Sequence, residues 1–225
     1  HKIYLKISKK LFYDYLNQDF SFYLNKNSAD LTRNIITEGN LFSFGVVFHC
    51  VRLVSEIIIF LSIGILLLIY SFEVTIITIS FFTLVGIFFL KLNSSNLRKW
   101  GEIRQFHSAK IFKQLQESFD GFRELLLNKL EIIFFNNFSR HALKNAEVGI
   151  KKDTTVQMPR LFLELTAITL VISIIIYLLS SGYDFKEIFV ILGVFLYATL
   201  RILPSVSKII QSIQSIKFNN AVIDI

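Results

Sequence analysis

Hydrophobic positions gather into four long runs that carry almost no charge. The runs cover residues 57–72, 74–90, 165–183 and 188–200. Each run approaches the roughly 20 residues that a helix needs to cross about 30 Å of hydrocarbon. Valine, isoleucine and phenylalanine dominate them, but no period-two alternation is present, and a bilayer requires a segment's backbone hydrogen bonds to close within it. The pattern predicts membrane-spanning helices rather than strands.

The four runs form two pairs, each joined by a short polar turn. Residues 71–73 separate the first two runs, and residues 180–187 separate the last two. Only one basic residue, Lys186, lies in these turns, whereas residues 1–40 carry six basic side chains and 91–160 is rich in lysine and arginine. Because basic segments stay in the cytoplasm, we expect a multi-pass protein of a bacterial inner membrane with both ends inside.

The cytoplasmic segments also follow a helical pattern. Apolar residues recur at helical spacing from Leu97 to Phe122, with no glycine between Gly101 and Gly121. A helix over 74–118 would be roughly 65 Å long, so it would project about 30 Å beyond the hydrocarbon. After Gly121 the amphipathic stretch 122–127 precedes a new helical pattern. A short transverse helix between two long helices is therefore expected.

The start of the chain shows a similar arrangement. A helix ends near Tyr15, a polar cluster covers 17–19, and a short aromatic segment covers 20–24. Asn27 or Ser28 is placed to cap the next helix. The expected segments are the end of one helix at 1–15, a first transverse segment at 16–27, long helices at 28–70, 74–118, 130–181 and 185–225, and a second transverse segment at 119–129.

Composition agrees with a membrane domain and argues against nucleic-acid binding. Apolar residues make up 53% of the 225 positions, and the net charge is +7. The basic residues alternate with acidic ones in the polar segments, so topology explains the charge better than a nucleic-acid partner does. The lone cysteine, Cys50, is expected to be buried and inert. The scattered histidines predict no metal site, and His107 and His141 are expected to be solvated.

This succession of elements resembles the transmembrane domain of type I ABC exporters over nearly the whole chain. The resemblance implies an all-α membrane fold, a helical bundle whose long helices extend into the cytoplasm. Helices three to six and the end of helix two would be present, and the first helix would be missing. The two transverse segments would be coupling helices that dock on nucleotide-binding domains.

Three strings are similar to the lipid-linked oligosaccharide flippases of the PglK type. They are Leu16-Asn17-Gln18 with Asn27-Ser28, then Arg33-Asn34-Ile35-Ile36, and Arg201-Ile202-Leu203-Pro204-Ser205 with Ser212 and Phe218. This resemblance implies an amphipathic, lipid-linked cargo.

The sequence contains no Gly-x-x-x-x-Gly-Lys-Ser/Thr loop, so we expect no catalytic residue and no ATP hydrolysis by this segment alone. The resemblance places a nucleotide-binding domain after Ile225, which would bind ATP and Mg²⁺. Expected partners are membrane lipid, a second copy of the chain and nucleotide-binding domains.

Charged side chains at lipid depth cost about 2.5–3.5 kcal/mol, so they should face the bundle or a water-filled cavity. Guanidinium groups bind pyrophosphate oxygens with forked, charge-assisted hydrogen bonds. Instead of binding substrate, Arg52 could form an ion pair with Glu56, which lies one helical turn away. His49 could likewise be an ordinary interior side chain rather than a substrate contact. The candidate substrate-cavity residues are Arg52, Arg201, Lys208 and His49.

Two prolines, Pro159 and Pro204, lie inside helical patterns, where a lost backbone donor predicts a kink or a packing bend. The transverse segments would expose apolar side chains, so another protein surface should cover them. Packing between the segments, or dimerisation, is the alternative. The candidate coupling residues are Phe20, Phe22, Tyr23, Phe122, Arg123 and Leu125.

The leading hypothesis is an ATP-driven exporter or flippase for a lipid-linked oligosaccharide or another amphipathic lipid. A peptide or drug exporter fits the same architecture, and we expect Arg52 and Arg201 to line one cavity if the cargo is the lipid. A membrane receptor or scaffold is the alternative of another class. A membrane-embedded enzyme is disfavoured because the apolar runs contain no cluster of residues with catalytic spacing.

Overall fold

The computed structural model describes residues 1–225 except 25, 71, 181–184 and 224–225. The described part consists of helices and short connections, and no strand occurs in it. The predicted all-α membrane fold with long helices is confirmed. The predicted hairpin turn at 180–187 falls largely on residues 181–184, which lie outside the described part.

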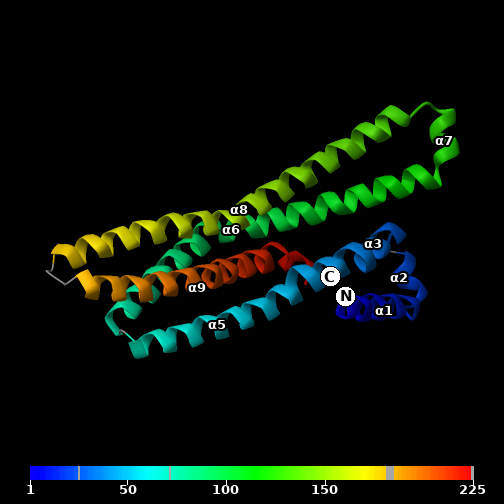
Figure 1. The fold of residues 1–225 in the computed structure, drawn as a ribbon. Helices are drawn as coiled ribbons and strands as arrows, with labels where there is room; N and C mark the ends of the chain where they lie inside the picture. The colour runs from blue at the N-terminus through cyan, green and yellow to red at the C-terminus, as the bar shows by residue number, and fades with distance from the viewer. Residues whose placement is uncertain (25, 71, 181–184, 224–225) are drawn as a thin grey trace. The chain divides into compact units, whose positions relative to one another are not determined.

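Figure 1 shows the order of the helices along the chain. Between α3 and α5 the backbone widens into two π-helical stretches, η1 (Asn34–Glu38) and η2 (Phe42–Val47), and a 3₁₀ turn, η3 (Asn220–Val222), follows α9. The helices are α1 (Lys2–Leu16), α2 (Phe20–Leu24), α3 (Ser28–Arg33), α4 (Gly39–Leu41), α5 (Phe48–Tyr70), α6 (Phe72–Asp120), α7 (Phe122–Leu127), α8 (Glu131–Ser180) and α9 (Phe185–Phe218).

Local chemistry fixes several helix ends. Asn27 is the N-cap of α3, and its side-chain oxygen accepts a hydrogen bond from the Ala29 amide at 2.9 Å, so one of the two predicted caps is confirmed. Gly121 ends α6 and precedes α7, while Asn128 follows α7 and donates to the Glu124 carbonyl at 2.8 Å. Helices α6 and α8 form a hairpin, and the short helix α7 connects them at one end (Figure 1).

Membrane-crossing length is present in three helical segments of the described chain, Ser28–Ile69, Glu131–Ser180 and Ile188–Phe218. A fourth is reached when Thr78–Leu92 and Ser95–Asp120, both within α6, are taken as one span. Each of the four hydrophobic runs found in the sequence lies largely within one of these segments, and the polar part of each segment, such as 131–160 in α8, lies beyond its hydrophobic run. The chain is therefore a multi-pass membrane protein.

The chain divides into two compact units, and the first contains His1–His49, Ser95–Asp153 and Ser215–Ile225. Its small apolar core consists of Leu97, Val148 and Phe218, with Trp100 packed against them. A buried ionic cluster lies in the same unit. Glu38 is 2% exposed and receives hydrogen bonds from both terminal nitrogens of Arg104, at 3.3 and 2.9 Å. Arg33 lies 3.9 Å from the same carboxylate.

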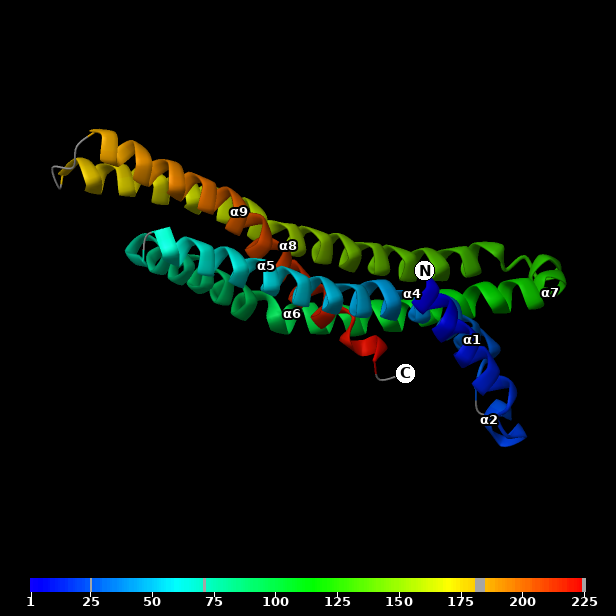
Figure 2. The same ribbon diagram turned by 60° about the horizontal axis from the view of Figure 1, so that its bottom comes forward.

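The end of α9 lies beside α6 within this first unit (Figure 2). A Cβ atom on Gly101 of α6 would lie 2.0 Å from the Phe218 carbonyl oxygen, and one on Gly45 would lie 2.5 Å from the Asn219 side chain. Gln105 donates to the Ala221 carbonyl at 3.1 Å, which satisfies a backbone acceptor just beyond the helix. Close backbone approach thus requires glycine at position 101, whereas at position 45 a Cβ atom would displace the Asn219 side chain.

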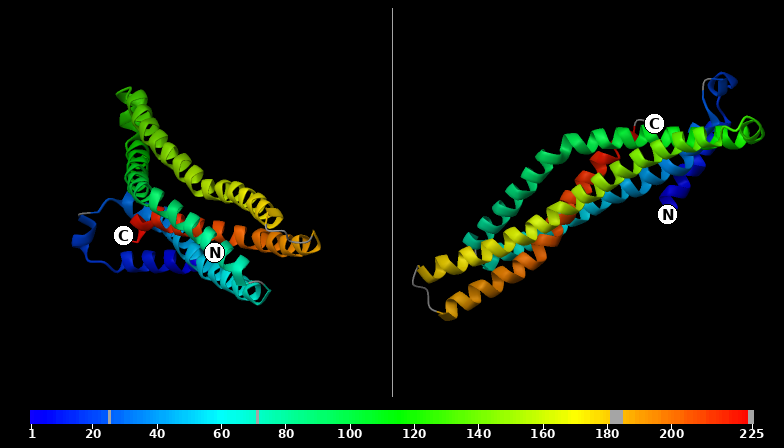
Figure 3. Two further views of the ribbon diagram at one scale, coloured as in Figure 1. Left: turned by 90° about the vertical axis from the view of Figure 1, so that its left-hand side faces the viewer. Right: turned by 90° about the horizontal axis from the view of Figure 1, so that it is seen from above.

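The second unit contains Cys50–Ser94 and Thr154–Gln214. Figure 3 shows the later part of α8 beside the earlier part of α9. Its apolar core joins four helices and consists of Leu67, Phe82, Phe89, Leu163, Ala167, Ala198, Ile202, Val206 and Ile210. Many large apolar side chains point outward, among them Ile69 at 80% and Phe189 at 75% exposure. Such a surface suits lipid rather than water.

Cys50 corrects an expectation from the sequence. Its side chain is exposed, not buried. The physical reason is that an apolar stretch of a membrane helix has two apolar environments available, protein and lipid. Hydrophobicity alone therefore cannot tell which face of α5 points inward.

Candidate functional site

Three helices of the second unit direct polar side chains into one cavity. On α9, Leu203, Ser207 and Gln211 are four residues apart and share a face, and Lys208 follows on its edge. On α8, Arg160 and Glu164 form a further pair at helical spacing, and α5 contributes Arg52. The cavity has a volume of about 360 Å³ and is lined by Arg52, Arg160, Glu164, Leu203, Pro204, Ser207, Lys208 and Gln211. We call it the basic cavity.

The charges of the basic cavity are only partly compensated. Arg160 donates to Glu164 at 2.9 Å within α8, and Lys208 of α9 lies 2.8 Å from Glu56 of α5. Within the described residues, Arg52 forms no ion pair. The predicted alternative of an Arg52–Glu56 pair is wrong, because Glu56 faces Lys208 across the two helices. Arg52 therefore keeps its charge available to a ligand.

A second cavity adjoins the first and has the opposite character. It has a volume of about 330 Å³ and shares Glu164 and Leu203 with the basic cavity. Apart from Glu164 and Thr199, its lining is apolar: Ala167, Ile168, Val171, Leu196, Leu200 and Leu203. We call it the apolar cavity. The two together offer a cationic end and a hydrophobic end to a single ligand.

The other predicted cavity residues lie elsewhere. Arg201 is exposed on α9 and is not among the residues that line either cavity. His49 is half-buried in the first unit, edge-on to Phe48 with ring centroids 5.5 Å apart. Pro204 lines the basic cavity, while Pro159 is buried within α8, and both prolines lie inside continuous helices. Of the four candidates, the structure brings Arg52 and Lys208 together. The expectation that Arg52 and Arg201 line one cavity, which was to distinguish lipid cargo from peptide or drug cargo, is not met.

Sequence reasoning passed over Arg160, Ser207 and Gln211. Their signal was available, because Arg160 lies one turn before Glu164, and Ser207 and Gln211 lie one and two turns beyond Leu203. What the sequence lacks is the packing that turns the α8 and α9 faces toward Arg52. The cavity contains no nucleophile–base pair, and the described residues hold no group of three or more metal-ligating side chains. The charged and neutral polar side chains of the basic cavity are suited to hold a polar or anionic group.

The two transverse segments present a mixed surface. Phe20 is 77% exposed and Phe122 is 55% exposed, and Arg123 is exposed as well. Phe22 instead packs on Tyr15 and Tyr23, with ring centroids 5.9 and 5.6 Å away. Leu125 is buried, contrary to the expectation that it would be exposed, because it turns inward between α6 and α8.

Beside α7 lies an aromatic groove of about 400 Å³. Its lining is mainly apolar and comes from the end of α6, from α7 and from the start of α8: Leu115, Ser118, Phe119, Phe122, Leu125, Glu131, Phe134, Phe135 and Phe138. A groove of this size, edged by exposed aromatic rings, is typical of a surface that another protein covers.

Comparison with known families agrees with the multi-pass membrane fold. The family described as the ABC transporter transmembrane region matches residues 1–202. The match includes both transverse segments and all of α8, and ends at Ile202 in α9, next to the cavity residue Leu203. Membership implies association with membrane lipid and with nucleotide-binding domains. The chain belongs to the ABC transporter transmembrane region family.

Proposed function

We propose that this chain is the translocating part of an ATP-driven exporter or flippase whose cargo is an amphipathic lipid with an anionic head group, a lipid-linked oligosaccharide. The observation that carries the proposal is the junction of the two cavities. Arg52, Arg160 and Lys208 stand at one end and an apolar wall at the other, with Leu203 shared between them.

The charge of the basic cavity favours a phosphate-bearing head group. Three cations line it: Arg160 is paired with Glu164, Lys208 is paired with Glu56, and Arg52 forms no ion pair among the described residues. Arg52 has the planar fork that matches phosphate oxygens, and Lys208 adds a point charge. Ser207 and Gln211 supply neutral hydrogen-bonding groups for a sugar or phosphate oxygen. A cationic drug would be repelled by the same set.

The mechanism we propose uses the transverse helices. Two copies pair, each with a nucleotide-binding domain that holds ATP and Mg²⁺, and closure of those domains moves α2 and α7. The aromatic groove beside α7 and the exposed Phe20 and Phe122 support such docking. The long helices then switch as rigid bodies between inward and outward access, and cargo moves because the two states bind it differently. We place this cycle in a bacterial inner membrane.

The test uses the complete transporter, this domain with its nucleotide-binding domain, in lipid vesicles. We expect polyprenyl-pyrophosphate oligosaccharide to stimulate ATP hydrolysis, and Arg52→Ala to raise the concentration needed for half-stimulation by about tenfold, as for a lost charge-assisted contact. Lys91→Gln, an exposed cation of the second unit outside both cavities, should leave it unchanged.

The remaining outcomes separate the alternatives. Stimulation by peptides or drugs but not by the lipid would assign the transporter another cargo. Basal hydrolysis unaffected by any cargo lipid would contradict the lipid proposal. Arg201→Ala is a useful second variant, because an effect equal to that of Arg52→Ala would show that an exposed arginine of α9 also meets the head group.

A further inference from the structure

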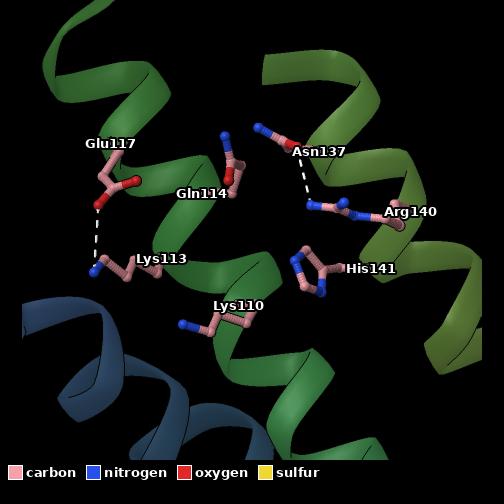
Figure 4. A pocket seen from close by; sticks show the side chains of 7 residues that line it. All are labelled: Lys110, Lys113, Gln114, Glu117, Asn137, Arg140 and His141. Atoms are coloured by element: carbon pink, nitrogen blue, oxygen red, sulfur yellow. Dashed lines mark hydrogen bonds and ion pairs between the residues drawn. The ribbon is translucent and has the colours of Figure 1, made fainter. Parts of the chain in front are cut away.

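A second basic pocket lies in the first unit, between α6 and α8 (Figure 4). Its volume is about 270 Å³. The α6 residues are spaced by three and four positions, as are the α8 residues, so each set shares one helix face. The lining residues are Lys110, Lys113, Gln114 and Glu117 from α6, and Asn137, Arg140 and His141 from α8. We call it the α6–α8 pocket.

Two cations of this pocket have no counter-ion among the described residues. Lys110 lies over the Phe106 ring at 5.6 Å, and Arg140 donates only to the neutral Asn137 amide at 3.2 Å. Nearby cations of the same helices are compensated: Lys113 by Glu117, and Lys144 by Glu147. The pocket therefore concentrates positive charge that the protein itself does not neutralise.

A histidine pair adds to this charge balance. The Nδ1 atoms of His107 on α6 and His141 on α8 are 2.8 Å apart, so one ring donates to the other. Burial lowers the pKa of His141 below its ordinary value of 6.5, and repulsion by His107, Arg140 and Lys110 lowers it further. The two histidines, expected to be solvated, are half-buried and in contact with each other. A bound anion would relieve this repulsion and favour the charged imidazole.

We propose that the α6–α8 pocket binds a small, soluble phosphate compound, held by Lys110, Arg140 and His141. An arginine fork and a lysine charge suit phosphate oxygens, and the Gln114 and Asn137 amides add neutral donors. A metal dication fits poorly, because Lys110 and Arg140 would repel it. Every lining side chain is polar, so the pocket offers no wall for an acyl chain, and a soluble compound fits better than a lipid head group.

The bound anion would join α6 to α8 next to the hairpin that carries α7. The other charged groups that line the pocket or contact α6 do not replace this anion. Lys113 and Glu117 of α6 form an ion pair with each other. In the neighbouring segment of α3 and η1, Arg33 is paired with Asp30 and Glu38, and Glu38 is also paired with Arg104 of α6. Occupancy and protonation of His141 should therefore be linked.

The test follows His141 directly by NMR in the complete transporter, with ¹³Cε1-labelled histidine in nanodiscs of neutral lipid. His141→Asn identifies the resonance by its loss. Inorganic pyrophosphate, added without magnesium, should raise the midpoint of the His141 titration. The readout is local, so pyrophosphate bound to a nucleotide-binding domain does not produce it.

The variants make the outcome decisive. In Lys110→Gln/Arg140→Gln the pyrophosphate concentration needed for half of the shift should rise about tenfold or more, since two charge-assisted contacts are lost. Lys144→Gln, a paired surface lysine of α8, should change it less than about twofold. Equal melting temperatures confirm that these exposed positions leave the fold intact.

Three results would overturn the proposal. Pyrophosphate could fail to move the His141 titration in the wild-type protein, or could move it equally in the double variant. The shift could also arise from nanodiscs with anionic phospholipid and no added pyrophosphate, which would assign the pocket to a lipid head group instead.

Discussion

Two buried carboxylates, one in each unit, are held in different ways. Glu38 of the first unit receives two hydrogen bonds from Arg104 and has Arg33 beside it. Glu56 of the second unit is 6% exposed and faces a single cation, Lys208, whose own side chain is 41% exposed. The second carboxylate oxygen of Glu56 has no hydrogen-bond partner among the described residues.

The difference separates a structural contact from a binding site. A buried carboxylate with two arginines is fully compensated, so the cluster around Glu38 has little capacity for a ligand and holds helices of the first unit together. Lys208 is partly exposed and lines a cavity with Arg52, which forms no ion pair among the described residues. We propose that the contact of Lys208 with Glu56 is exchanged for one with an anionic head group when cargo binds. In our proposal, incompletely compensated charge distinguishes the basic cavity from the ionic cluster around Glu38.

The largest expected effect comes from removing the first carboxylate. Glu38→Gln leaves Arg104 buried without its counter-charge and leaves Arg33 with Asp30 as its only acidic partner among the described residues, which should lower the free energy of unfolding by about 3–5 kcal/mol. Glu102→Gln breaks the exposed pair with Arg98 and should cost about 0–1 kcal/mol. Both are measured by denaturant titration in detergent. Equal decreases in the free energy of unfolding of the two variants would show that Glu38 does not stabilise the fold of the first unit.

A glycine pair tests the close packing of the first unit next. Gly101→Ala places a Cβ atom 2.0 Å from the Phe218 carbonyl oxygen and should destabilise the protein by about 1–3 kcal/mol through overpacking. Gly149→Ala meets nothing within 4 Å and should stabilise its helix by about 0.5–1 kcal/mol. The same unfolding titration measures both. Effects of the same sign would contradict the close contact between α6 and the end of α9.

The third effect concerns the exchangeable carboxylate. Glu56→Gln frees the charge of Lys208, so the complete transporter should respond to anionic lipid-linked cargo at concentrations lower by about threefold to tenfold. Glu56→Asp keeps the charge and is the control. Cargo-stimulated ATP hydrolysis gives the measurement. A weaker response in Glu56→Gln would mean that Glu56 positions Lys208 rather than competes for it.

The smallest effect is a pH dependence in the first unit. The pKa of His141 is lowered in the folded protein, so the unfolded chain binds this proton more tightly, and stability should fall as the pH drops below about 6.5. His141→Asn should lose that part of the dependence. Melting temperatures between pH 7.5 and 5.5 report it. An identical change of melting temperature with pH in the variant would show that His141 does not contribute to the pH dependence.

The sequence predicted what depends on local pattern. The long apolar helices, the two short helices α2 and α7 and the Asn27 cap follow from periodicity and capping chemistry, and the structure contains them. The candidate Arg52 followed from the cost of charge near lipid, as did Arg201, and Lys208 followed from the expected pyrophosphate of a lipid-linked cargo; Arg52 and Lys208 line one cavity, and Arg201 does not. These features need no knowledge of which helices pack together.

What the sequence could not supply depends on contacts between distant segments. Glu38 and Arg104 are 66 positions apart, and nothing in either neighbourhood marks the other as its partner. The same holds for His107 with His141, and for Glu56, whose nearest cation in sequence, Arg52, is not its partner. The π-helical stretches η1 and η2 also lack a local signal, since they contain ordinary helix-forming residues together with glycine and β-branched ones.

The central claim is that the basic and apolar cavities together hold one lipid-linked cargo, and photolabelling tests it most directly. A polyprenyl-pyrophosphate oligosaccharide with a photoreactive group in the first part of its polyprenyl chain is cross-linked to the complete transporter, and the labelled residues are mapped by mass spectrometry. The account predicts labels at Ile168 and Leu200 of the apolar cavity that unlabelled cargo displaces and that Arg52→Ala/Lys208→Ala abolishes. Labels confined to other surfaces, or unchanged in that double variant, would contradict it.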